Sequence, residues 1–167
     1  MAAETTYVTG DATDPQGDGL KVIVHCCNNL GVWGAGFVMA LSRKWERPEA
    51  EYKKWAAKYG ERFRRMLGST LMVPVEEDII VANLVGQEGV GRGHDGKPPV
   101  RYEAIFQGLT HFQTFREQRG EFSVHMPRMG CGLAGGDWNR IEEILAVTLN
   151  EHDIPVTVYD LPGGPTF

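Results

Sequence analysis

The chain has 167 residues, 42% of them hydrophobic, and a formal net charge of −5; this length predicts one domain with its own core, which we place at residues 1–161, followed by a flexible tail at 162–167. The acidic balance argues against general nucleic-acid binding, because such surfaces carry an excess of Lys and Arg. Because the sequence has neither an apolar run long enough to span a bilayer nor a signal-peptide pattern at its start, we expect a cytoplasmic protein without membrane contacts, and we take it as a monomer.

Short β-branched runs alternate with amphipathic patterns along the chain. In chain order we expect strands at 4–9 and 21–25, a helix from 36 that Pro48 stops or restarts, a helix from about 49 to 60, strands at 70–74 and 79–85, a helix at 101–116, a strand at 122–126, a helix at 138–150 and a strand at 155–159. This alternation predicts an α/β fold, a three-layer α/β/α sandwich with a mixed, mostly parallel sheet of about six strands. The sheet is mixed because the connection from 74 to 79 is too short for a parallel crossover.

A glycine-rich loop between the strand at 122–126 and the helix at 138–150 is the most informative stretch of the sequence. It reads PRMGCGLAGGDW, with four glycines in the seven positions from Gly130 to Gly136. Glycines allow positive φ and the close approach of another molecule, and the N–H groups of such a loop beside a helix N-terminus form an anion site. The loop therefore suits a phosphate, although a lone loop of this kind is more often a tight turn with Asp137 as N-cap.

A second loop of the same kind strengthens the phosphate interpretation. It reads HCCNNLGVWGAGFV from His25 to Val38, and it again runs from an apolar strand through glycines into a helix. Two such junctions in one small α/β chain are typical of two walls around a ligand with more than one phosphate, or with a phosphate and a sugar. Because the chain is acidic, backbone N–H groups and a few chosen side chains must hold that anion.

The three cysteines, Cys26, Cys27 and Cys131, all fall in the two glycine-loop regions. Their odd number and the lack of CxxC or Cys/His spacing argue against a metal site, so we expect reduced side chains and no metal. A nucleophilic role for Cys131 is a minority interpretation, since no partner is specified nearby in the sequence. The glycine-rich stretch at 86–99 is either a mobile surface excursion or part of a site.

Three motifs together resemble those of the macrodomains, the family with the ADP-ribose-binding fold. They are GDAT at 10–13, HCCNN…GVWGAGFV at 25–38 and PRMGCGLAGGDW at 127–138. Each motif is weak singly, but in this order they are specific, and the resemblance covers essentially the whole chain. Within the family, the second glycine loop is most similar to the branch that contains terminal ADP-ribose protein glycohydrolase.

The resemblance implies where an ADP-ribose molecule would bind. Asp11 would accept a hydrogen bond from the adenine amino group beside the Ala12 N–H, and Tyr159 and Asp160 would border the adenine. Asn28 would approach the distal ribose. The two glycine loops would hold the diphosphate from opposite sides, through Gly34, Ala35, Gly36, Phe37 and Val38 in the first and Gly130, Cys131, Gly132, Leu133 and Ala134 in the second.

The catalytic residues of the family do not carry over intact. Gln87 and Ala134 stand where the glycohydrolase branch has a lysine and an acid, and Ala35 stands where another branch has an aspartate, so no lysine adduct with the ribose is expected. The remaining catalytic candidates are Gln87 itself, Asn28, which would orient the ribose or a water, and Asp137, which would act as a base. The long loop adds three further candidates, which are Glu88, Arg92 and His94. Water activated by the phosphate of the ligand is another route, which needs no catalytic side chain.

These observations favour an enzyme that hydrolyses mono-ADP-ribose from modified proteins. Acidic side chains, glutamate or aspartate, are the expected attachment sites, because an ester linkage is more labile than an amide or an N-glycoside. A non-catalytic reader of ADP-ribose and a phosphatase acting on ADP-ribose 1″-phosphate remain as alternatives. The expected partners are ADP-ribose and mono-ADP-ribosylated proteins, and no cofactor is expected.

Overall fold

The computed structural model describes residues 3–93, 95–132 and 134–163, so the predictions for His94, Leu133 and residues 164–167 of the tail lie outside the described residues. Within these ranges the strands form one sheet in the order β1-β6-β5-β2-β4-β3, in which β3 is antiparallel to β4 and all other neighbours are parallel. The strands are β1 Thr5–Thr9, β2 Lys21–Asn28, β3 Thr70–Glu76, β4 Ile79–Gln87, β5 Ser123–Met126 and β6 Val156–Asp160.

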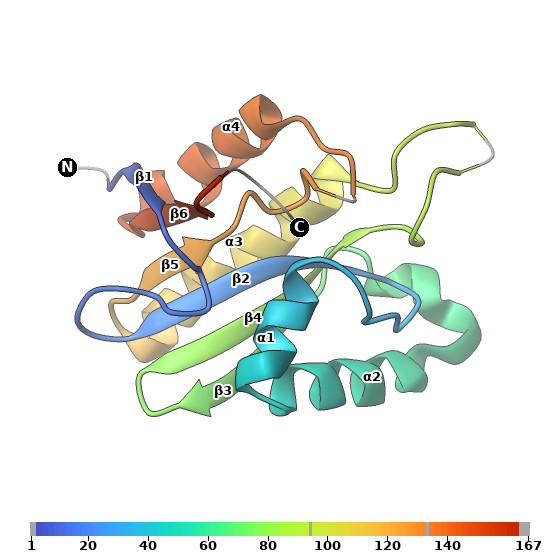
Figure 1. Ribbon diagram of the computed structural model, residues 1–167, viewed down its shortest axis with the longest axis horizontal. Helices are drawn as coiled ribbons and strands as arrows, with labels where there is room; N and C mark the ends of the chain where they lie inside the picture. Colours follow the sequence, from blue (N-terminus) through green and yellow to red (C-terminus); the bar gives the residue numbers. More distant parts are fainter. Residues whose placement is uncertain (1–2, 94, 133, 164–167) are drawn as a thin grey trace.

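Helices cover both faces of this sheet (Figure 1). One face carries α1 (Phe37–Lys44) and α2 (Arg47–Tyr59), after which a 3₁₀ helix, η1 (Gly60–Met66), leads back to the sheet. The other face carries α3 (Tyr102–Arg119) and α4 (Trp138–Thr148), with the short 3₁₀ turn η2 at Asn150–His152. The predicted three-layer α/β/α sandwich with a mixed, mostly parallel sheet is therefore confirmed.

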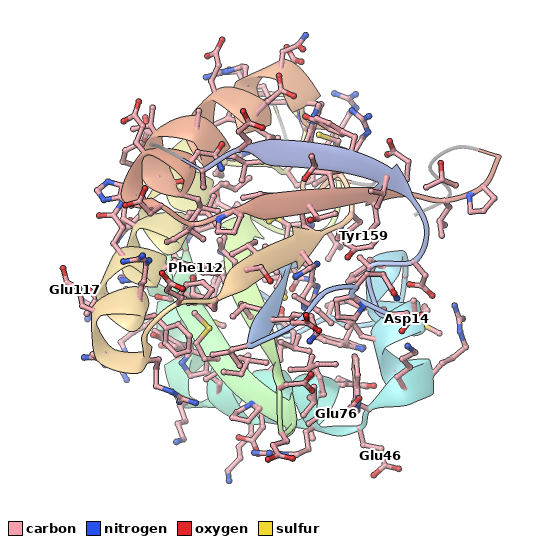
Figure 2. The ribbon with its side chains drawn as sticks, turned by 90° about the vertical axis from the view of Figure 1, so that its left-hand side faces the viewer. Asp14, Glu46, Glu76, Phe112, Glu117 and Tyr159 are labelled. Atoms are coloured by element: carbon pink, nitrogen blue, oxygen red, sulfur yellow. The ribbon has the colours of Figure 1, made fainter. Side chains whose placement is uncertain are left out.

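The period of two along each strand divides the core into two halves. Val22 and Val24 of β2 pack with the buried side chains of α3 and α4, whereas Ile23 between them packs with those of α1 and α2. All three are fully buried, as expected for a central strand that is covered on both faces. Figure 2 shows Phe112 of α3 against the sheet, in the first of these two clusters.

Several boundaries differ from those expected, for local physical reasons. The second helix begins at Arg47 and holds Pro48 in its first turn, where the missing N–H of proline leaves no hydrogen bond unmade. β3 continues past Pro74 to Glu76 because it lies at an edge of the sheet, where proline is tolerated. β2 extends to Asn28 because β4 continues to pair with it. The 3₁₀ helix η1 was not predicted.

The carboxyl ends of the parallel strands meet at one edge of the sheet, and this edge positions the site. The loops after β2, β4 and β5 all leave from it, and in open α/β sheets ligands bind in the crevice at that edge. Over the described residues, no helix is both long enough and apolar enough to cross a membrane.

Candidate functional site

A cavity of about 830 Å³ opens at the carboxyl edge of the sheet, between the two glycine loops. The first loop lines it from one side and the second from the other, and β2, β4 and the loop after β4 complete the wall. The lining residues are His25, Cys26, Val32, Gly34, Ala35, Gly36, Phe37, Val38, Gln87, Val90, Pro127, Arg128, Met129, Gly130, Cys131, Gly132 and Ala134. A volume of this size suits a ligand as large as a dinucleotide fragment.

The first glycine loop is shaped by the side chain of Asn28. Its Oδ1 accepts from the backbone N–H groups of Leu30 (2.9 Å) and Val32 (3.2 Å), and its Nδ2 donates to the Val32 carbonyl (2.7 Å). The buried Tyr52 hydroxyl lies 2.6 Å from the Asn28 carbonyl and accepts from the Gly31 N–H (3.2 Å). Asn28 and Tyr52 together fix the path of the chain from β2 into the cavity wall.

Replacement of Tyr52 by phenylalanine is expected to lower the free energy of unfolding by about 1–3 kcal/mol, because the buried Asn28 carbonyl and the half-buried Gly31 N–H lose a partner. We also expect weaker ligand binding, since the loop that lines the cavity loses its anchor. Urea unfolding measures the stability, and Tyr59→Phe, on the same helix but partly exposed, is the matched control. Equal stability of the two variants would show that Tyr52 does not hold the loop.

The N-terminus of α1 is the end that faces the cavity. Gly36, with φ 79°, turns the chain into the helix, and neither a side-chain cap nor an acidic residue occupies the first turn. The N–H groups at such a helix end carry partial positive charge. In α4, by contrast, the Asp137 carboxylate accepts from the Asn139 N–H at 3.0 Å and already caps the helix. We therefore expect the anion at the N-terminus of α1 rather than at that of α4.

The second glycine loop is closed upon itself. The Gly136 N–H donates to the Gly130 carbonyl at 2.7 Å, so a side chain at residue 136 would collide with that oxygen. Gly130 has φ 79°, a conformation that favours glycine. The glycines at 130 and 136 are thus required by the loop itself, while Gly132 lies in the cavity wall.

The long loop after β4 is anchored between the two glycine loops. An antiparallel bridge between Gln87 and Val100 closes its base. On one side the Gly89 N–H donates to Asn29 Oδ1 at 3.0 Å, and on the other the Val100 N–H donates to the Ala134 carbonyl at 3.1 Å. Beyond this base the loop projects from the body of the molecule (Figure 1). Its base therefore belongs to the site.

Among the described residues that line the cavity there is no carboxylate, and its other titratable groups are held neutral at pH 7 apart from Arg128. Burial lowers the pKa of His25 to about 4, and the His25 Nε2–H donates to Asn83 Oδ1 at 2.5 Å. Burial also raises the pKa of Cys26 to about 12 and that of Cys131 to about 11. Both thiols are therefore protonated and poor nucleophiles, which argues against the nucleophilic interpretation of Cys131.

Arg128 is the one cation among the described lining residues, and it is already paired. Its Nε and Nη2 atoms lie 2.8 and 3.0 Å from the two carboxylate oxygens of Asp160. The guanidinium also lies 5.2 Å from the ring centre of Tyr7 and 5.3 Å from that of Trp138. The hydrogen bonds that Arg128 donates to Asp160 raise the pKa of Arg128. Most of its charge is thus compensated within the protein.

Ala12 and Tyr159 belong to one buried cluster, and Asp11 precedes Ala12 on the loop after β1. β1 and β6 lie beyond β5 in the sheet, and none of these three residues lines the cavity. The loop after β1 carries Asp11, whose Oδ1 accepts from the Thr13 N–H and hydroxyl, each at 2.8 Å. The Gln16 N–H donates to the Tyr159 hydroxyl at 2.9 Å, and this hydroxyl lies 2.7 Å from His125 Nδ1. Figure 2 shows Tyr159 on β6 and Asp14 on this loop.

The structure separates the predicted residues into two groups. One cavity is lined by the residues from Gly34 to Val38, by those from Gly130 to Gly132, and by Ala134 and Gln87, while Leu133 lies outside the described residues. Asp11, Ala12, Asn28, Tyr159 and Asp137 are not in its wall: the amide of Asn28 is used by the loop, and Asp137 caps α4. Their contacts with a ligand stay predictions. The sequence analysis missed Val32, Val90 and Arg128; only Arg128, a lone cation directly before the second glycine loop, had a recognisable signal.

The fold and the cavity define a class of protein: an α/β/α sandwich with a cavity between two glycine loops at the carboxyl edge of its sheet. No protein-family profile matches the chain. A solved structure from Bacteroides thetaiotaomicron, described as a protein of unknown function, is 48% identical, with a TM-score of 0.90 over 96% of this chain and 100% of that one.

A second solved structure identifies the family. A macrodomain protein from Streptomyces coelicolor is 44% identical, with a TM-score of 0.78, and the match covers 93% of this chain and 98% of that one. The chain therefore belongs to the macrodomain family. Among curated proteins, an ADP-ribose 1″-phosphate phosphatase of Saccharomyces cerevisiae (strain YJM789) is 26% identical over 93% of this chain and 98% of its own length. The homologues are thus ADP-ribose-related proteins.

Proposed function

We propose that this macrodomain binds ADP-ribose in the cavity and hydrolyses mono-ADP-ribose esters on glutamate or aspartate side chains of modified proteins. The observation that carries the proposal is the cavity between two glycine loops at the N-terminus of α1, in a protein of the macrodomain family. Backbone N–H groups there suit a diphosphate, whose charge is spread over several oxygens.

The position of the Asp11 loop supports adenine binding beyond the β5 end of the cavity. Both hydrogen bonds that Asp11 accepts within its loop use Oδ1, so Oδ2 takes part in neither. A carboxylate oxygen is an acceptor for the amino group of adenine. With the adenine beside β1 and β6 and the diphosphate between the glycine loops, the distal ribose lies toward β4, beside Gln87 and Val90.

The electrostatics of the wall favour an ester as the bond that is cleaved. Departure of a glutamate or aspartate releases a carboxylate, a leaving group with a pKa near 4 that needs no proton donor. Departure of an amine or amide needs a general acid. Because the described lining residues offer neither a carboxylate nor an ionised thiol at pH 7, we infer that water is positioned by the phosphate of the ligand, with Gln87 beside it.

Phosphatase activity on ADP-ribose 1″-phosphate is the second candidate, and the similarity to the Saccharomyces cerevisiae phosphatase favours it. A terminal phosphate adds up to two negative charges at the distal end. The one cation among the described lining residues, Arg128, is held by Asp160 beside Tyr7 and Trp138, at the β5 end. The described residues that line the distal end thus contribute no cation to that phosphate, and for this reason we rank the ester hydrolase first.

One pair of assays tests both candidates. The protein is incubated with a peptide that carries ADP-ribose on glutamate and, separately, with ADP-ribose 1″-phosphate, while free ADP-ribose and inorganic phosphate are measured. We expect release of ADP-ribose from the peptide and binding of ADP-ribose in a calorimetric titration. A peptide that survives excess protein would refute the ester hydrolase, and phosphate release alone would establish the phosphatase. Binding of ADP-ribose without either reaction would show that the protein is a non-catalytic ADP-ribose-binding module.

A further inference from the structure

The distal end of the cavity has a rim of exposed aliphatic side chains. Val32 in the first glycine loop and Val90 in the long loop both line the cavity, and they are 49% and 54% exposed. In the proposed binding mode, the group attached to the distal ribose leaves the cavity at this rim. The surfaces beside Val90 therefore contact whatever carries the ADP-ribose.

Cations gather on the two segments next to this rim, η1 and the long loop. We call these exposed side chains the basic ridge; they are Arg62, Arg64, Arg65, Arg92 and Lys97. The two segments touch, because Arg64 Nε lies 3.1 Å from Glu88 Oε1, and Glu88 also accepts from Arg101 Nη2 at 3.4 Å. Figure 1 shows the long loop projecting beyond the sheet at this side.

The two segments that carry the basic ridge differ in charge from the rest of the protein. Residues 60–66 and 86–101 hold six of the 17 Lys and Arg residues and three of the 22 carboxylates. The rest of the chain keeps 11 cations against 19 carboxylates. One of the three carboxylates in these two segments, Glu88, already forms ion pairs with two arginines, Arg64 and Arg101. An excess of positive charge on the segments beside the exit of the cavity attracts an acidic group at close range.

We propose that the basic ridge and Val90 form a docking surface for an acidic polypeptide segment that flanks the ADP-ribosylated side chain. The proposal rests on the proposed function and adds the class of substrate. A polypeptide fits better than a nucleic acid for two reasons. The rim is aliphatic and has no exposed aromatic ring among the described residues of the long loop, whereas single strands bind by stacking on such rings. The strongly acidic remainder of the surface also repels a long polyanion.

The test compares two peptides that carry ADP-ribose on the same glutamate, one flanked by aspartate and glutamate and the other by glutamine and serine. Binding is measured by competition against labelled ADP-ribose, and hydrolysis by kcat and KM. At low ionic strength we expect the acidic peptide to bind about 10-fold more tightly, and the difference to vanish at about 1 M salt, where the Debye length is about 3 Å.

A charge-reversal pair locates the effect. Arg62→Glu with Lys97→Glu is expected to remove the preference for the acidic peptide, with kcat and the affinity for free ADP-ribose unchanged. Arg43→Glu with Arg119→Glu makes the same change in net charge at exposed positions on α1 and α3 and is expected to leave the preference intact. Equal binding of the two peptides by the unchanged protein, or equal effects of the two variants, would overturn the proposal.

The outcomes separate this proposal from the proposed function. Binding of the acidic peptide without release of ADP-ribose would refute the hydrolase and keep the docking surface. Failure of ADP-ribose itself to bind would refute both. A single-stranded DNA oligonucleotide that competes as well as the acidic peptide, and loses this effect in the Arg62→Glu, Lys97→Glu variant, would assign the ridge to nucleic acid and overturn the polypeptide.

Discussion

Replacement of Gly34 by valine is expected to lower the affinity for ADP-ribose by about 100-fold, or about 2.7 kcal/mol, while the free energy of unfolding stays the same. Gly34 lines the cavity, does not have a positive φ, and has no protein atom within 4 Å of the place where a Cβ would stand. A Cβ at this position therefore meets no atom beyond those of its chain neighbours, and the backbone there is not strained by a side chain. The new methyl groups take space beside the N-terminus of α1, where the diphosphate is expected.

Gly91→Val is the matched control, because Gly91 is also exposed, also has an open Cβ position and is not in the cavity wall. Calorimetric titration with ADP-ribose measures the affinity, and urea unfolding measures the stability. Unchanged affinity of the Gly34 variant would show that the ligand does not pass this loop. A large loss of stability would show instead that Gly34 is needed for the fold.

Acid is expected to destabilise the protein between about pH 6.5 and pH 4, because of two buried histidines. Burial lowers the pKa of His25 and of His125 to about 4, and the charge of Lys21 acts in the same direction on His125. The unfolded chain takes up these protons near pH 6.5. Stability that is fully present above pH 6.5 is therefore lost as the pH falls toward 4, by about 3 kcal/mol for each histidine.

A loss of this size is comparable to the whole stability of a typical domain, about 5–15 kcal/mol. Urea unfolding at pH 7.5, 6 and 4.5 measures it. His125→Gln is expected to lower the stability at pH 7.5 and to flatten the pH dependence, whereas His111→Gln, at an exposed position on α3, is expected to leave the slope unchanged. Equal stability of the unchanged protein at pH 7.5 and 4.5 would contradict the prediction.

Two paired carboxylates add to the loss of stability below about pH 4. Lys21 lowers the pKa of Asp78, and Arg128 lowers the pKa of Asp160.

His125 also connects the core to the expected adenine end. Its Nε2 lies 2.7 Å from Ser123 Oγ and its Nδ1 lies 2.7 Å from the Tyr159 hydroxyl, which in turn accepts from the Gln16 N–H. In the neutral tautomer with its proton on Nε2, His125 accepts a hydrogen bond from the Tyr159 hydroxyl at Nδ1, and a protonated imidazole cannot accept it. The loop that carries Asp11 is thus held in part by a buried neutral imidazole.

The sequence by itself determined the fold class and the two walls of the cavity. The period of two along β2, the short connection between β3 and β4, and glycines at strand–helix junctions are local patterns, and each acts through the backbone of its own segment. For this reason Gly34, Gly36, Gly130 and Gly132 lie where the sequence placed them, around one cavity.

Only the tertiary structure decided how the side chains are used. Asn28 shapes its own loop, Asp137 caps α4, and Arg128 is paired with Asp160 across two strands. Partners such as Asp160 lie far away in the sequence, and the low pKa of His25 comes from burial beneath residues of other elements. Val90 lies at the rim of the cavity because the base of its loop forms hydrogen bonds with both glycine loops. Side-chain contacts, burial and charge compensation arise between segments, and no local pattern encodes them.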